Sequence, residues 1–542
     1  MSTAVRPHEI RISGHSRTGN FAGNWCSFGL FVLLVFATTA KFVAFINALS
    51  FSAGYGGTRL GLVISLAQAG LWWWMARGLG VVGIAAAWLL QTFYLVICWS
   101  YFTYFGLYLT FATAVSVIAE GATAVRHAGL PVDIDMLWLL ADLPFAFAWC
   151  VVDRRRWRWP AVGALAQFAV LALLWERAHH LFAWAAAERD NRYTAPALFI
   201  AELGLLPTQL AQAGKRNRSA DFRYGLEVAI NASATEPRDV LLVQVESLDV
   251  GAIERAMPLL AARIPSAVYY PRCLAYHGPG GSSDCDVAVI EGCEPLWDAV
   301  AFDQSEYPWP NSWVRRLRDA GWSAALAHGL GGTYFNFAQI MPRLGYELWD
   351  VDDLGLIEHP REFGARDSDL VDAVLARLPS LSSPFLLHVV TMTSHAPFTQ
   401  QRGWWSGPRS GNDYHDALAC VDAQLDRLLN GFFQRTPSGL VVLFGDHAAG
   451  LPSSAIERAG SVQREYVPLL IIGADVPPRI DERYASFLDI GRTVLPAVGW
   501  SGQWRTWGSD LLPADGPLAA VPFRGQPWMR EAAALAGETA RH

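Results

Sequence analysis

The sequence predicts an α-helical membrane domain of five transmembrane helices followed by an α/β domain with a mainly parallel sheet. The 542 residues are 52% hydrophobic and 17% charged, whereas an ordinary soluble domain carries roughly 25% charged residues. Residues 1–175 hold 11 Lys and Arg against 6 Asp and Glu, and the remaining residues hold 31 against 43. A basic, apolar front and an acidic back predict a membrane anchor joined to a water-exposed domain. Neither part has the dense basic surface of a nucleic-acid binder, so no nucleic acid is expected as a partner.

Five apolar stretches are long enough to cross a hydrocarbon core of ~30 Å, and they lie near residues 26–50, 60–76, 79–100, 135–152 and 160–176. Arginine clusters begin at Arg6, Arg77 and Arg154, before the first stretch and in alternate loops. Because basic loops favour the cytoplasmic side, the C-terminal domain is expected outside. If the aromatic segment 101–125 were a sixth span, one arginine cluster would lie on the outer side of the membrane. The segment is therefore expected to be interfacial or re-entrant. We expect a multi-pass protein of the inner or plasma membrane, with a periplasmic or extracellular catalytic domain.

Charged residues inside the predicted spans are a separate signal. Lys41 falls in the first span, and Asp135 and Asp142 fall in or near the fourth. Ionisable groups are costly in hydrocarbon and mark functional sites by default. An internal ion pair, or side chains that reach the membrane surface from a helix end, would explain them equally well.

Four cysteines, at positions 273, 285, 293 and 420, fall in the expected outer domain. Disulfides persist in such an oxidising compartment. Four cysteines allow three pairings, and the sequence does not choose between them. A zinc knuckle is disfavoured because no CxxC pair occurs.

Changes in composition divide the chain into a transmembrane domain (1–176), a juxtamembrane linker (177–237), a catalytic domain (238–515) and a C-terminal tail (516–542). In the catalytic domain, short β-rich runs alternate with helical patterns, which is typical of a mainly parallel sheet covered by helices. The predicted strands are Asp239–Val245, Ser323–Ala327, Phe385–Val390, Leu440–Phe444 and Val467–Ile472.

Polar residues stand where these strands end. Glu246 and His328 end the first two, His395 follows the third, and Asp446 and His447 end the fourth. Ligands of open α/β sheets bind beyond the carboxyl ends of the strands, so these residues are expected to converge. Carboxylates and imidazoles suit one divalent ion, with Mn²⁺ preferred and Mg²⁺ or Zn²⁺ as alternatives.

A glycine-rich segment, His277 to Asp284, supplies a group that such an ion could activate. Its glycines allow close backbone approach, and its serines resemble a helix start, where a phosphate would be favoured. A hydroxyl held on the ion could ionise and attack phosphorus, giving a phospho-enzyme. The alternative is a plain loop that ends in an N-cap serine.

Taken together, these motifs resemble the lipoteichoic acid synthase family of phosphoglycerol transferases, within the sulfatase-like branch of the alkaline phosphatase superfamily. The likeness rests on the order of VQVES, GGSSD, HG followed by TYFN, TMTSHAPF, FGDH and LDIGRTVLP. It implies a sulfatase-like α/β domain with Ser282 as nucleophile. It also implies that Glu246, Ser282, Asp446 and His447 bind the metal, that His395 is catalytic, and that His328, His395, Phe335 and Asn336 bind substrate.

Two substitutions set this chain apart from that family. Where the family has an acidic residue after HG and an Arg after the aromatic-Asn pair, this sequence has Leu330 and Phe337. Another phospho-alcohol headgroup, such as phosphoethanolamine, or a different acceptor glycan is therefore an alternative. Ser282 lacks the C/S-x-P/A-x-R context of a formylglycine sulfatase, which argues against cleavage of sulfate esters.

The expected function is a membrane-anchored transferase that moves a phospho-alcohol headgroup from a phospholipid donor to an extracytoplasmic glycan or lipid acceptor through a phospho-serine. A phosphodiesterase or phosphatase that uses water as acceptor is the main alternative. A non-catalytic membrane sensor of lipid or glycan is the third.

Overall fold

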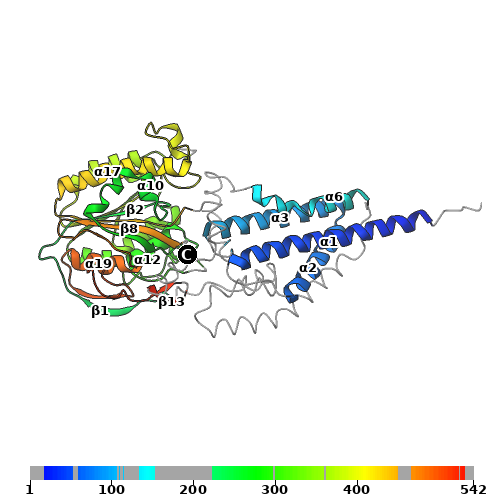
Figure 1. Ribbon diagram of the computed structural model, residues 1–542, viewed down its shortest axis with the longest axis horizontal. Helices are drawn as coiled ribbons and strands as arrows, with labels where there is room; N and C mark the ends of the chain where they lie inside the picture. Colours follow the sequence, from blue (N-terminus) through cyan, green and yellow to red (C-terminus); the bar gives the residue numbers. More distant parts are fainter. Residues whose placement is uncertain are drawn as a thin grey trace, which may run out of the picture.

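The computed structural model describes residues 18–52, 59–105, 109, 114, 134–152, 222–296, 299–358, 362–449, 465–523 and 525–530. A bundle of long helices occupies one end of the molecule and a layered α/β body the other (Figure 1). These two parts correspond to the predicted membrane and catalytic regions.

The helical region consists of α1 (Thr18–Ser52), α2 (Arg59–Gly78), α3 (Gly80–Phe105), η1 (Ile134–Leu140) and α6 (Leu143–Val152). Among the described residues, Trp25–Phe45 and Gly80–Tyr101 are long and apolar enough to cross a membrane, and Met136–Val152 is a shorter apolar stretch. The fifth predicted span, 160–176, lies outside the described residues, so the number of spans stays a prediction. Residues 101–105 continue α3, which corrects the expectation that an interfacial segment begins at Tyr101.

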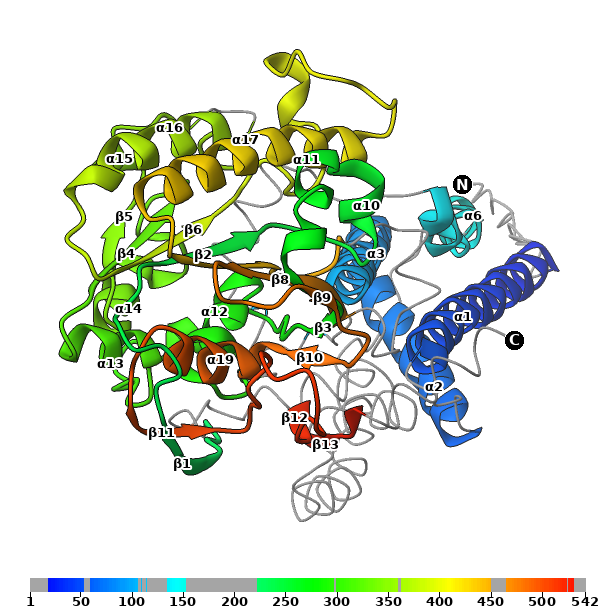
Figure 2. The ribbon, with the colours of Figure 1, turned by 60° about the vertical axis from the view of Figure 1, so that its left-hand side comes forward.

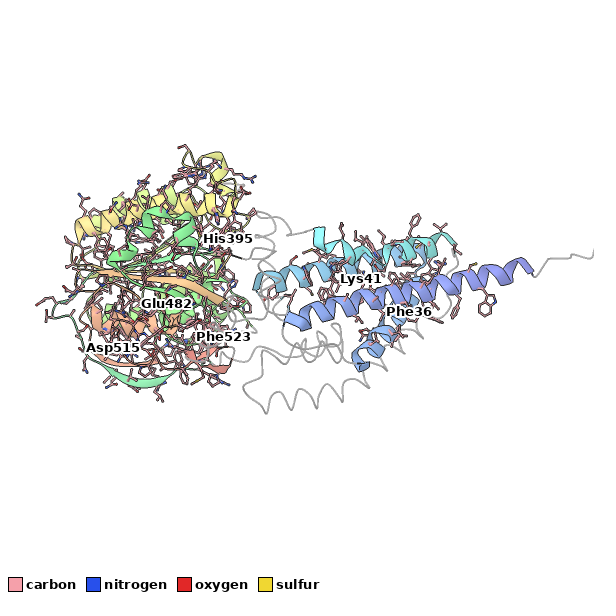
Figure 3. The ribbon with its side chains drawn as sticks, in the orientation of Figure 1. Phe36, Lys41, His395, Glu482, Asp515 and Phe523 are labelled. Atoms are coloured by element: carbon pink, nitrogen blue, oxygen red, sulfur yellow. The ribbon has the colours of Figure 1, made fainter. Side chains whose placement is uncertain are left out.

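A buried polar network joins the helices of this region. The Asp142 carboxylate accepts hydrogen bonds from Lys41 Nζ at 2.7 Å, Gln91 Nε2 at 2.7 Å, Thr38 Oγ1 at 2.8 Å and Trp88 Nε1 at 3.0 Å. Both side chains of the Lys41–Asp142 pair are fully buried, and Lys41 lies within the bundle in Figure 3. The internal ion pair is thus the correct explanation of these two charges.

The main sheet of the described chain has nine strands, with β2 near its centre. Its central strands are apolar runs buried on both faces, the pattern expected of parallel strands covered by helices. β2 pairs in parallel with β6 and β7, whereas β8 runs antiparallel to β7 and β3, so the sheet is mainly parallel as predicted. The strands are β2 (Val240–Val245), β3 (Val268–Leu274), β4 (Ser323–His328), β5 (Glu347–Trp349), β6 (Phe385–Val390), β7 (Leu440–Gly445), β8 (Tyr466–Gly473), β9 (Arg479–Ile480) and β10 (Ala485–Ser486).

Helices cover both faces of this sheet (Figure 2). One apolar core lies under α10 (Ala252–Ala256), α11 (Pro258–Ala261), α15 (Val351–Leu354), α16 (Asp367–Arg377) and α17 (Asp413–Arg435). The other lies under α12 (Ser282–Glu291), α13 (Trp313–Asp319), α14 (Phe337–Leu344) and α19 (Ile490–Ala497). Because α12 begins next to the carboxyl ends of the central strands, its first residue can reach the site.

Smaller strands lie at the boundaries of the catalytic body. β1 (Leu226–Ile230) belongs to the segment assigned to the linker, and it pairs antiparallel with β11 (Gly502–Thr506). β12 (Val521–Phe523) and β13 (Gln526–Trp528), in the segment assigned to the tail, pair with each other. The expected juxtamembrane helix lies outside the described residues.

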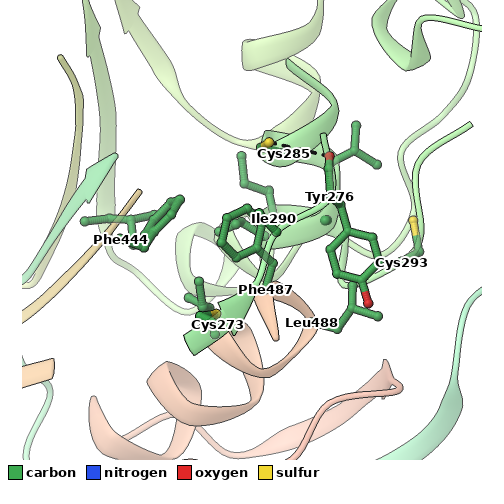
Figure 4. Packing of buried hydrophobic residues seen from close by; sticks show 14 of the residues in the cluster. Cys273, Tyr276, Cys285, Ile290, Cys293, Phe444, Phe487 and Leu488 are labelled. Atoms are coloured by element: carbon green, nitrogen blue, oxygen red, sulfur yellow. Dashed lines mark hydrogen bonds between the residues drawn. The ribbon is translucent and has the colours of Figure 1, made fainter. Parts of the chain in front are cut away.

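The expected disulfides are absent: all four cysteines of the catalytic region are buried free thiols. In Figure 4, Cys273, Cys285 and Cys293 occupy separate positions in the apolar packing around Phe487. Cys285 Sγ instead donates to the carbonyl oxygen of Asp446, at 3.0 Å. Because a large apolar core surrounds these cysteines, the fold does not need disulfide bonds for stability. The thiols pack as small apolar groups.

Candidate metal centre and nucleophile

Three ligating side chains meet at the carboxyl ends of two neighbouring parallel strands. Glu246 follows β2, and Asp446 and His447 follow β7. Each offers a ligand atom, and these atoms lie within 4.8 Å of one another. The convergence follows from the parallel pairing, which brings both strand ends to one edge of the sheet.

Ser282 contributes the fourth group. Its Oγ donates to Asp446 Oδ2 at 2.7 Å and lies 3.4 Å from Glu246 Oε2. The N-cap of α12 is Gly281, which makes no side-chain cap, so the alternative of an N-cap serine is wrong. Ser282 is the first residue of the helix, and its hydroxyl faces the carboxylates.

The glycine loop before Ser282 places this hydroxyl. Gly281 has φ 55° and ψ −131°, a conformation that side chains exclude. A Cβ at Gly278 would lie 2.4 Å from Asp284 Oδ2. The Asp284 carboxylate accepts from the backbone N–H groups of Gly280, at 2.8 Å, and Ala301, at 3.1 Å. Asp284 therefore holds the loop.

Ser247 is a site residue that sequence reasoning missed. Its φ of 55° lies in the left-handed region, which non-glycine residues rarely adopt outside functional sites. Its Oγ donates to Glu246 Oε1 at 2.7 Å, and its backbone N–H donates to Asp446 Oδ1 at 2.9 Å. Ser247 thus orients both carboxylates, and only its position beside Glu246 could have suggested this.

The pKa values of the cluster show competition between negative charges. Burial, and then the charge of Glu246, raise the pKa of Asp446 to about 7. Burial opposes the ionisation of Glu246, but the charge of His447 and its hydrogen bond lower the Glu246 pKa below its usual range. Burial also opposes a charge on His447, yet the two carboxylates raise its pKa to about 10. Without a metal, His447 supplies the cation that the carboxylates need.

The imidazole of His447 is oriented for ligation. Its Nδ1 lies 3.0 Å from the carbonyl oxygen of Ala448 and donates to it, which leaves Nε2 facing Glu246 Oε1 at 3.3 Å. Its ring stacks on His277, with centroids 4.1 Å apart and an angle of 22°. His277 is a second residue that sequence reasoning did not assign, although it begins the glycine-rich segment.

A divalent metal ion fits this donor set. Two buried carboxylates, one buried imidazole nitrogen and one half-buried hydroxyl form a compact set of hard ligands, the kind that Mn²⁺, Mg²⁺ and Zn²⁺ accept. A cation bound between the Glu246 and Asp446 carboxylates would offset the repulsion between their negative charges. The residues expected to bind metal are therefore gathered as predicted.

The histidines expected to act on substrate lie beside this cluster. His395 Nδ1 is 2.7 Å from the carbonyl oxygen of Ala396, its ring stacks on Phe363 at 3.9 Å, and its charge acts on Glu246. His328 is buried, and burial lowers its pKa to about 4, so it is neutral at pH 7. His328 therefore cannot supply a proton as an acid at that pH.

The expected headgroup segment is aromatic. Phe335 and Asn336 form part of η4 (Tyr334–Asn336), both with positive φ. Asn336 Nδ2 donates to the carbonyl oxygen of Phe302, at 3.3 Å. Phe337 packs against His328, with ring centroids 4.9 Å apart. Phe337, the residue that differs from the arginine implied by the family resemblance, therefore packs on a candidate substrate-binding histidine.

Comparisons with known proteins identify distant relatives of this chain. The family described as Sulfatase matches residues 299–500. Lipoteichoic acid synthase 2 of Bacillus subtilis is 22% identical over 326 residues, which cover 53% of this chain and 49% of that protein. Residues 299–500 therefore match the sulfatases, an enzyme family of the alkaline phosphatase superfamily, and the lipoteichoic acid synthases are distant homologues of this chain.

Other relatives of this chain are equally distant. Lipoteichoic acid synthase 1 of Bacillus subtilis is 22% identical over 273 residues, which cover 46% of this chain and 42% of that protein. The chain thus spans about half the length of the curated relatives it matches. A solved structure, the integral membrane protein lipooligosaccharide phosphoethanolamine transferase A of Neisseria meningitidis, has a TM-score of 0.53 at 15% identity, with 87% of this chain and 95% of that chain covered. That likeness shows the fold, helical region included.

Proposed function

We propose that this protein is a membrane-anchored, metal-dependent transferase that moves a phospho-alcohol headgroup from a phospholipid to an extracytoplasmic glycan or lipid. The observation that carries the proposal is the Ser282 hydroxyl, 2.7 Å from Asp446 and among three metal-binding side chains. A half-buried hydroxyl held among hard ligands is suited to attack phosphorus.

In the first half-reaction, Ser282 Oγ attacks the phosphodiester, forming an Oγ–P bond while the bond from phosphorus to the diacylglycerol oxygen breaks. A divalent ion held by Glu246, Asp446, His447 and Ser282 would lower the pKa of the hydroxyl and neutralise charge on the phosphoryl oxygens. Asp446 Oδ2 accepts the Ser282 hydrogen bond and can receive its proton. His395 delivers a proton to the diacylglycerol oxygen. In the second, an acceptor hydroxyl gives its proton to His395 and its oxygen bonds to phosphorus, while the Oγ–P bond breaks and Ser282 Oγ regains the proton held by Asp446.

The location of the site supports a lipid donor. His395 lies on the side of the catalytic body that faces the helices (Figure 3). Tyr101, near the end of α3, is close enough to Asp284 of the nucleophile loop to interact with it electrostatically. A site at the end of a membrane helix can receive a headgroup while the acyl chains stay in the bilayer.

The aromatic segment favours an amino-alcohol headgroup. Phe337, Phe363 and Tyr334 lie beside the two histidines, and Leu330 replaces the acidic residue that would bind glycerol hydroxyls. Aromatic faces attract ammonium groups, whereas a polyol needs hydrogen-bonding partners. Phosphoethanolamine is thus the first headgroup to test, with phosphoglycerol second.

The purified full chain would be incubated in mixed micelles with phosphatidylethanolamine or phosphatidylglycerol and Mn²⁺. We expect diacylglycerol to be released, and mass spectrometry to find a headgroup adduct on the peptide that contains Ser282. Both products should be lost in Ser282→Ala and retained in Asp319→Asn, a control variant at an exposed residue. If Ser282→Ala matches the wild type, the proposal fails. If the free headgroup is the sole product whichever glycan acceptor is added, the protein is instead a hydrolase.

A further inference from the structure

A second layer of polar side chains lies directly beneath the metal centre. Gln244 precedes Glu246 by two residues on β2, so its side chain points to the same face, one pleat deeper. Asp286 follows Ser282 by four residues on α12, so it lies one helical turn deeper on the same side. Asp286 and Asp446 are close enough for their charges to interact.

His388 and Tyr346 complete this layer. His388 of β6 stands beside Leu242 of β2 in the parallel register, on the face that also carries Gln244. Tyr346 Oη lies 3.3 Å from His388 Nδ1, and the Tyr346 hydroxyl interacts electrostatically with Asp286. We refer to Gln244, Asp286, Tyr346 and His388 as the inner layer.

Five polar atoms of the inner layer are buried without a hydrogen-bond partner among the described residues. Gln244, Asp286 and His388 are fully buried. Among the described residues, neither amide atom of Gln244, neither carboxyl oxygen of Asp286, nor Nε2 of His388 has a hydrogen-bond partner. Native proteins rarely leave buried polar atoms unsatisfied, so a small polar ligand is required here.

The chemistry of the inner layer identifies that ligand as water. The atoms that lack partners include the Gln244 amide donors as well as carboxyl and amide oxygens, and water can bridge such a mixed set. A hard cation requires oxygen ligands and would be repelled by the amide hydrogens.

We propose that Gln244, Asp286 and His388 bind internal water molecules beneath the metal centre, and that this hydrated layer positions Ser282 through the first turn of α12. Five atoms without partners correspond to about two waters at the usual three hydrogen bonds each. Asp286 acts as a positioning residue, since it reaches the nucleophile only through the helix. The water site itself does not depend on the proposed function.

The first test is a high-resolution structure of the full chain with Mn²⁺. We expect density peaks within hydrogen-bond distance of the Asp286 carboxyl and the Gln244 amide. Direct contacts between these side chains, with no such peaks, would overturn the proposal. Crystals grown with Rb⁺ distinguish water from a cation, because an anomalous peak at this position would identify a cation and rule out water.

The second test compares Asp286→Asn, Asp286→Leu and the exposed control Asp319→Leu. Asparagine can still bind the waters, so Mn²⁺ affinity and kcat should stay within about threefold, whereas leucine excludes them. For Asp286→Leu we expect Mn²⁺ affinity and kcat to fall at least about tenfold, with KM unchanged, because Ser282 is both ligand and nucleophile. Equal values for Asp286→Leu and wild type refute the positioning role.

If Asp286→Leu does not fold, Gln244→Met replaces it with the same expectation. Mn²⁺ affinity, measured by calorimetry, reports on Ser282 even if no headgroup is transferred. Failure of the proposed function therefore does not affect this test.

Discussion

Replacing Asp142 with leucine tests whether the buried ion pair holds the helical region together. The substitution leaves the Lys41 ammonium fully buried with no carboxylate. Breaking a buried pair by removing one partner costs about 3–5 kcal/mol. The lost hydrogen bonds from Thr38, Trp88 and Gln91 add about 0.6 kcal/mol each, the typical value between membrane helices. We expect the free energy of unfolding to fall by about 5–7 kcal/mol.

The double variant Lys41→Met with Asp142→Leu separates the charge from the hydrogen bonds. It removes both charges, so only the hydrogen-bond loss of about 2 kcal/mol should remain. Unfolding of the purified chain in detergent, followed by tryptophan fluorescence, gives the four free energies of a double-mutant cycle: those of the wild type, Asp142→Leu, Lys41→Met and the double variant. A double variant as unstable as Asp142→Leu alone would refute the reasoning, because the cost would then not come from an unpaired charge.

Three further predictions concern the catalytic body. Metal binding must displace protons from Asp446 (pKa about 7) and His447 (pKa about 10), so affinity should rise about a hundredfold per pH unit below pH 7 and about tenfold per unit from pH 7 to 10. Calorimetry in buffers of different ionisation enthalpy counts these protons, and a pH-independent affinity would contradict the prediction. Gly280→Ala would put a methyl group 2.6 Å from Asp284 Oδ1; urea unfolding should show a loss of about 1–3 kcal/mol. Gly403→Ala, with open space around its Cβ, should show none. Dithiothreitol should leave the melting temperature unchanged because the cysteines are free thiols, whereas loss of a native disulfide costs about 2–5 kcal/mol.

Much of the catalytic fold could be predicted because its central strands are uninterrupted apolar runs. β6 has the predicted bounds, and β2, β4, β7 and β8 differ from prediction by a residue or so at an end. β3 (Val268–Leu274) was not predicted, since its tyrosines, Pro271 and Arg272 break the apolar run. The antiparallel direction of β8 could not be derived, because strand direction depends on how the chain returns and leaves no local pattern.

The convergence of Glu246, Asp446 and His447 could be predicted because each follows the end of a buried strand. Ser247 and His277 could not, since a positive φ and a ring stack depend on contacts between distant segments. The inner layer did leave a signal that was overlooked. Gln244 in VLLVQV and His388 in FLLHVV are polar residues inside otherwise apolar strands, where a buried polar side chain requires a partner.

The position of β2 in the sheet also governs the order in which the site can form. β2 is the first strand of the main sheet in the chain, yet its neighbours begin at Phe385 and Leu440. Such long-range pairing is slow, because a large loop must close before any contact forms. Glu246 meets Asp446 and His447 only after β7 has docked, so an emerging chain cannot hold the ion. A bound metal therefore marks a chain that has completed its folding, and its removal should speed unfolding of the whole body.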